Sequence, residues 1–81
     1  MSNVIALPHR HRAYLRAVAD GRAEMTCSRQ PDLFIDGLAC CDQHTAHQLA
    51  ENGLISPARP GTPGQRVPAV LTDTGNAALA A

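Results

Sequence analysis

The sequence predicts a small α+β domain with about three helices, a few short strands and a β-hairpin. Apolar residues recur at helical spacing in two stretches, residues 8–20 and residues 43–52. Shorter runs rich in strand-forming residues lie between and after these stretches. The tract 60–65, Pro-Gly-Thr-Pro-Gly-Gln, favours a turn throughout and separates two of the strand runs, as the loop of a hairpin does.

Length and composition limit the size of the core. The chain has 81 residues, with one Phe, one Tyr and no Trp. A chain of this length buries only about 60 to 65% of its unfolded surface. We expect one domain over residues 8–81, preceded by a flexible arm at residues 1–7. So thin a core hardly accommodates a deep substrate pocket, and we therefore expect neither an enzyme nor a cofactor.

Cysteine usage and hydropathy indicate a cytoplasmic protein without membrane contact. No apolar run approaches the roughly 20 residues that a membrane span needs. The first residues lack the basic start of a signal peptide. Cys27, Cys40 and Cys41 are odd in number and include an adjacent pair, which fits a reducing compartment.

The formal charge is zero, but it is unevenly distributed. All seven basic residues are Arg, and five of the seven acidic residues lie between Glu24 and Glu51. Five arginines flank this acidic middle: Arg10, Arg12, Arg16, Arg59 and Arg66. The positive ends of the chain could orient the domain on a polyanion.

The first helix is predicted from Pro8 to Asp20, where Asp20-Gly21 stops it. Its core face carries Leu7, His11, Tyr14, Leu15 and Val18. Arg12 and Arg16 share the opposite side, either as a solvated face or as an edge that contacts phosphates.

The next segment contains one strand and one ambiguous element. Residues 22–28 favour a short strand, which Gln30-Pro31-Asp32 ends. In residues 31–37, β-branching and brevity favour a strand, whereas Pro31 and Gly37 suit the start and the end of a short helix.

The second helix is predicted from residue 43 to residue 52. Asp42 suits its N-cap, and Gly53 suits the left-handed residue that ends it. Its apolar side carries Thr45, Ala46, Leu49 and Ala50. Its polar side carries Gln43, His44, His47, Gln48 and Glu51.

Residues 54–59 and 66–71 are predicted to pair as a hairpin. Pro57 and Pro68 lack an N–H, which predicts a separate two-stranded flap made of edge strands. Thr72-Asp73 suits the cap of a short closing helix. We expect one core made of Leu15, Val18, Phe34, Ile35, Leu38, Ala46, Leu49, Leu54, Val70, Leu71 and Leu79.

This order of elements resembles the winged helix-turn-helix fold of small bacterial and phage transcription regulators. The pattern Leu49-x-x-x-Gly53-Leu54-Ile55 looks like the end of a recognition helix that enters the wing. The pattern Leu71-Thr72-x-x-Gly75-x-x-x-Leu79 looks like the exit from the wing. Together they cover about half of the chain, from Asp42 to its end.

The resemblance implies sequence-specific binding of double-stranded DNA by a small transcription regulator. Helix 43–52 would lie in the major groove, and wing 56–68 on the backbone or in a neighbouring groove. The expected base contacts are Gln43, His44, His47 and Gln48. The expected backbone contacts are Arg10, Arg12, Arg16, Thr45, Arg59 and Arg66. The resemblance also allows a homodimer on DNA.

Two other interpretations compete. Zinc could be held by the cysteines and histidines, Cys27, Cys40, Cys41, His44 and His47. The Cys-x-x-Cys pair of structural zinc sites is missing, so we favour packed thiols and expect no metal. A winged helix that binds a protein partner, and not DNA, would show the zero net charge and the uncharged-to-acidic helix face found here. A continuous positive band from the N-terminal arginines to the wing would favour DNA.

Overall fold

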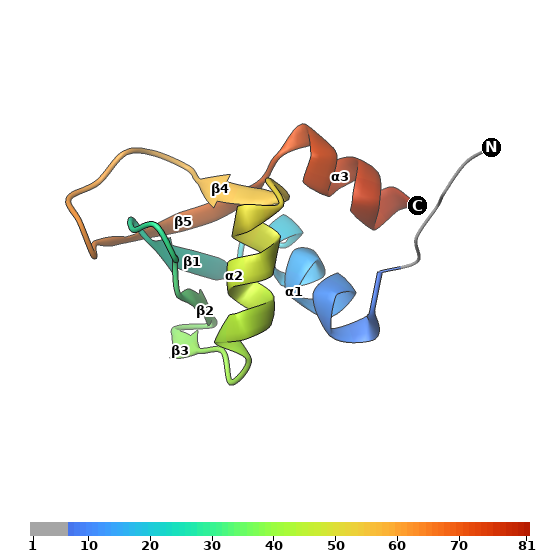
Figure 1. Ribbon diagram of the computed structural model, residues 1–81, viewed down its shortest axis with the longest axis horizontal. Helices are drawn as coiled ribbons and strands as arrows, with labels where there is room; N and C mark the ends of the chain where they lie inside the picture. The colour runs from blue at the N-terminus through green and yellow to red at the C-terminus, as the bar shows by residue number, and fades with distance from the viewer. Residues whose placement is uncertain (1–6) are drawn as a thin grey trace.

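The computed structural model describes residues 7–81 (Figure 1). Its elements in chain order are α1 (His9–Ala19), β1 (Ala23–Thr26), β2 (Leu33–Ile35), β3 (Leu38–Ala39), α2 (Gln43–Glu51), β4 (Ile55–Pro57), β5 (Arg66–Leu71) and α3 (Asp73–Ala80). The α+β class is confirmed. The predicted arm lies outside the described residues except for Leu7, which packs against the core.

The five strands form one antiparallel sheet in the order β3-β2-β1-β5-β4. The prediction of a separate two-stranded flap is therefore wrong, because β5 lies inside the sheet between β1 and β4. Pro68 is tolerated there for a geometric reason. Its carbonyl accepts the N–H of Ala58 at 2.8 Å, so the side of Pro68 that lacks an N–H faces β4. This position lies just beyond Pro57, where β4 has ended, so no ladder hydrogen bond is lost.

Residues 31–37 contain a strand and not a helix. Ile35 pairs with Leu38 across the two-residue turn Asp36-Gly37. Both turn residues have positive φ, 54° and 82°. Asp-Gly is a preferred sequence for such a turn because a two-residue hairpin loop of this type requires positive φ at both positions. The segment between β1 and α2 is thus a hairpin, β2–β3.

One face of the sheet packs against the helices. Met25 pairs with Val67 and with Leu33 in neighbouring strands, and all three side chains are almost fully buried. On the helical side the core is completed by Leu15, Val18, Ala46 and Leu49, as the sequence predicted. Ile35, Leu54, Leu71 and Leu79 are partly buried against this core.

The predicted core is wrong at three positions. Leu38 is 74% exposed and Val70 is 41% exposed. Phe34 is half-buried on the outer face of the sheet, where it pairs in register with Glu24. Strand alternation explains Val70. Because Val67 and Ala69 are buried, the alternate positions Pro68 and Val70 lie on the outer face.

The start of α3 is fitted closely onto the turn between α2 and β4. Thr72 donates its N–H to the carbonyl oxygen of Leu54 at 3.1 Å and its hydroxyl to Gly53. The same hydroxyl accepts the N–H of Gly75 at 3.0 Å, which caps α3. A Cβ atom at Gly75 would overlap the carbonyl oxygen of Leu54. The Leu71-Thr72-x-x-Gly75 pattern therefore has a structural explanation in this close backbone contact.

We predict that Gly75→Ala destabilises the domain. In a solvent-exposed helix without this contact, Ala would be favoured over Gly by up to about 1 kcal/mol. Here the methyl group must displace the backbone at Leu54, and overpacking of this kind costs about 1 to 3 kcal/mol. Urea unfolding followed by circular dichroism measures the change. Asn76→Ala, at an exposed position of the same helix, is the control and should stay near wild type. A Gly75→Ala protein as stable as that control would contradict the close contact.

Candidate nucleic-acid interface

The start of α2 is fixed by Asp42, as predicted. Its carboxylate accepts the N–H of Thr45 at 3.0 Å and the Thr45 hydroxyl at 2.6 Å. Arg10 of α1 adds an ion pair at 3.0 Å. The hydrogen bonds from Thr45 first, and then Arg10, hold the pKa of the Asp42 carboxyl well below its usual range. The cap thus also joins α2 to α1.

Thr45 is only 5% exposed. Its hydroxyl is committed to Asp42, so it offers no exposed donor for the DNA-backbone contact that the sequence predicted.

Gln43 is engaged within the fold and not at the surface. Its amide nitrogen donates to the carbonyl oxygens of Leu33 at 3.0 Å and Cys40 at 2.9 Å. Its amide oxygen accepts the N–H of Leu33 at 2.9 Å. With donor and acceptor both in use, the predicted base contact of Gln43 lacks a free amide edge.

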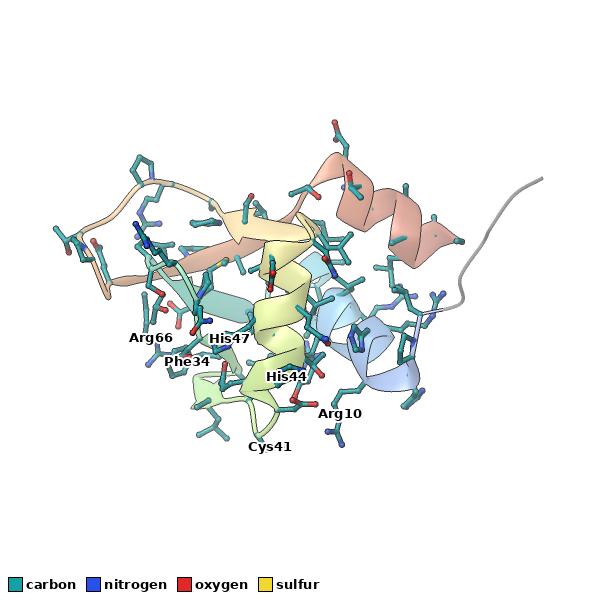
Figure 2. The ribbon with its side chains drawn as sticks, in the orientation of Figure 1. Arg10, Phe34, Cys41, His44, His47 and Arg66 are labelled. Atoms are coloured by element: carbon teal, nitrogen blue, oxygen red, sulfur yellow. The ribbon has the colours of Figure 1, made fainter. Side chains whose placement is uncertain are left out.

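The other predicted base-contacting residues divide into two groups. Gln48 is half-buried between α2 and α1, with its Oε1 3.3 Å from Nε2 of His11. His44 is exposed on the outer side of α2, and His47 lies at the side that faces the sheet (Figure 2). Nε2 of His47 is 3.2 Å from Oδ1 of Asp32. The exposed polar face of α2 is therefore built around the two histidines and Glu51.

The predicted backbone arginines lie in different environments. Arg10 is paired with Asp42. Arg12 donates to the carbonyl oxygens of Leu79 at 2.8 Å and Ala81 at 3.0 Å, so it satisfies the last carbonyls of α3. Arg16 and Arg59 are exposed, and within residues 7–81 neither forms an ion pair.

Arg66 lies on the outer face of the sheet, away from the core. It is 2.9 Å from Glu24 and its guanidinium lies 4.0 Å from the centre of the Phe34 ring. Both contacts stabilise the sheet, and the ion pair with Glu24 compensates the charge of Arg66. The structure therefore does not bring Arg66 together with the exposed face of α2.

An open groove of about 680 Å³ runs beside α2. It is lined by the loop between β1 and β2, by the second half of α2 and by β4, and Ile55 and Pro31 supply apolar walls. His47, Glu51 and Arg29 are its charged or titratable lining residues. Sequence analysis missed Arg29, because a single Arg between two short strands has no periodic or motif signal. Its position two residues before Pro31, which ends the preceding strand, indicated only that Arg29 lies in a loop.

The cysteines and histidines do not converge. Cys27 lies beside the β4–β5 loop, whereas Cys40 and Cys41 directly precede α2. Burial raises the pKa of the Cys40 thiol, as expected for a packed side chain. Over residues 7–81 no three His, Cys, Asp or Glu side chains are arranged to hold a metal ion.

Comparisons of this chain with protein-family models, with curated proteins and with solved structures find no match. The interpretation of the surface around α2 thus rests on its geometry and chemistry. In the described part of the chain, no helix combines the length and apolar character that crossing a membrane would take.

The low pKa of Asp42 predicts how stability depends on pH. A carboxyl with a depressed pKa in the folded state contributes stability above its unfolded pKa, near 3.8, and loses this contribution as pH falls below that value. Asp42→Asn keeps a good N-cap but removes the titration and the ion pair. We expect its Tm to lie below wild type at pH 7 and the gap to narrow between pH 4 and about pH 2. A gap independent of pH would contradict the role of the charge.

We predict that Gln43→Ala weakens folding. The N–H of Leu33 would lose its partner, which costs about 1 to 3 kcal/mol. Gln43→Glu should also be destabilised, because a carboxylate cannot donate to the two carbonyls. Gln30→Ala, at an exposed position, is the matched control. Denaturant unfolding measures the stability of all three variants. If both Gln43 variants were as stable as wild type, the contacts of Gln43 within the fold would be contradicted and its amide would be free to contact a base.

Proposed function

We propose that this chain binds double-stranded DNA sequence-specifically, as a small transcription regulator of the winged-helix type, in which the β2–β3 hairpin takes the place of the first helix of a helix-turn-helix pair. The observation that carries the proposal is the position of α2. The helix is exposed along His44 and Glu51, and Arg10 of α1 lies on one side of it (Figure 2). On the other side β4 lines the groove and leads into the β4–β5 loop, which carries Arg59. A helix exposed in this way can enter a major groove while its flanks contact the backbones.

The geometry refines the expected contacts. His44 and His47 are the proposed base contacts, since Gln43 and Gln48 are engaged with other parts of the fold. An imidazole ring can donate or accept a hydrogen bond, so it can contact base edges. Asp32 holds the Nε2 side of His47, which leaves Nδ1 for a ligand. The proposed phosphate contacts from the predicted set are Arg16 and Arg59, with Arg10 after exchange of Asp42 for a phosphate.

A second candidate function is binding of a protein partner through the same face. The observation in its favour is that carboxylates pair with three of the seven arginines: Arg10 pairs with Asp42, Arg22 with Asp36, and Arg66 with Glu24. Glu51 adds negative charge to the exposed face of α2. Positive potential is therefore divided between separate patches, which weakens attraction to a polyanion but suits a partner of mixed charge.

We predict different losses for base and phosphate contacts. After selection of a preferred duplex from a random library, His44→Ala should cost about 1 to 3 kcal/mol on that duplex and little on random DNA. Arg59→Ala should weaken binding to both duplexes alike and lower the slope of log K against log salt by about 0.9. Fluorescence anisotropy titrations at several salt concentrations measure both effects.

Arg22 supplies the control for these titrations. It is paired with Asp36 of the β2–β3 turn at 2.8 Å and does not line the groove beside α2, so Arg22→Ala should leave binding unchanged. Equal losses on both duplexes for His44→Ala would contradict the proposed base contact. No binding by the wild-type chain at low salt would reject the DNA proposal and favour the protein partner.

A further inference from the structure

We propose that the β1–β2 loop, residues 27–32, forms an additional phosphate-contacting edge of this interface, with Arg29 as the contacting side chain. The inference rests on the proposed DNA binding and extends it to an element that neither the motif pattern nor the charge distribution of the sequence singled out. Three features of the structure support it: a closed loop, its connections to α2 and to the hairpin, and the free charge at its tip.

The loop is closed by its own hydrogen bonds. Thr26 donates its N–H to the carbonyl oxygen of Asp32 at 3.1 Å. Asp32 donates its N–H to the Thr26 hydroxyl at 2.9 Å. Pro31, just before Asp32, is buried. Arg29 and Gln30 thus lie exposed in a turn whose two ends are held together, so little backbone freedom is lost when Arg29 contacts a ligand.

The same loop is connected to both other elements of the interface. Asp32 accepts a hydrogen bond from His47 of α2 at 3.2 Å. Cys27 donates its N–H to Gln65 at 2.9 Å, and its carbonyl accepts the N–H of Gly64 at 2.9 Å, both in the β4–β5 hairpin loop. In Figure 1 the β1–β2 loop lies between α2 and this hairpin. The helix, the loop and the hairpin therefore present one connected surface.

The charge of Arg29 is available for a ligand. Its side chain is exposed at the groove beside α2, and among residues 7–81 no carboxylate forms an ion pair with it. Arg66 is also an exposed arginine, but its guanidinium forms an ion pair with Glu24. A free guanidinium on a fixed base is suited to a phosphate, which accepts two of its N–H groups at once.

The position of Arg29 fits the backbone of DNA held by α2. A helix in the major groove, which is about 12 Å wide, has a phosphate backbone on each side. Arg10 and His47 lie on opposite sides of α2 (Figure 2). Arg29 lines the groove on the His47 side, so it would meet the strand opposite to the one near Arg10. Phosphate contacts on both sides would fix the helix in register.

The test compares Arg29→Ala with Arg22→Ala and wild type on one random duplex. If Arg29 contacts one phosphate, the slope of log K against log salt should fall by about 0.9. The ratio of Kd between 200 mM and 50 mM salt should then shrink by about 3.5-fold. Arg22→Ala should keep the wild-type slope. Circular dichroism confirms folding, and the exposed position of Arg29 makes a folding defect unexpected.

A second variant tests the same groove by removing a negative charge from it. Glu51 lines the same groove, so Glu51→Gln should raise affinity for random DNA if a phosphate backbone passes there. Weaker or unchanged binding of Glu51→Gln would overturn the placement. A wild-type slope for Arg29→Ala, or an equal fall for Arg22→Ala, overturns the inference while DNA binding by wild type stands. Absence of binding by wild type overturns both proposals.

Discussion

The orientation of α2 depends on polar contacts at its two ends more than on its small apolar face. At its start, the amide of Gln43 bridges Leu33 and Cys40 of the β2–β3 hairpin. At its end, Thr72 hydrogen-bonds Gly53 and Leu54. Between these points only Thr45, Ala46 and Leu49 are buried. Because two of these three side chains are small, burial alone would fix the helix weakly, and the end contacts decide which face points outward.

Local signals in the sequence predicted the helices well. The cap at Asp42 and the left-handed Gly53, with φ of 73°, are where the sequence placed them. The sheet was harder to predict, because its order depends on pairing between distant strands such as β1 and β5. The Asp36-Gly37 turn was a local signal whose alternative interpretation, a helix stop, used the same Gly. Val70 shows that burial in a strand follows its alternation and not only residue type.

The candidate site was less predictable than the fold. Arg10 and Asp42 are 32 residues apart, and Arg66 and Glu24 are 42 apart, so no sequence window shows that they neutralise each other. Gln43 has the side chain of a base-contacting residue, but its partner Leu33 is ten residues away in another element. Arg29 is exposed only because its loop turns outward beside α2. The charge that a ligand would meet is therefore set by tertiary contacts.

The short outer strands of the sheet bear on how copies of the chain behave when crowded together. A long, flat edge strand offers unpaired N–H and C=O groups and promotes aggregation between sheets. Here one edge, β3, has two residues, and the other, β4, has three and ends in Pro57, which cannot donate. Neither edge can extend far into a neighbouring molecule. Copies gathered along a polymer at high local concentration would therefore stay separate folded units and not merge through their sheets.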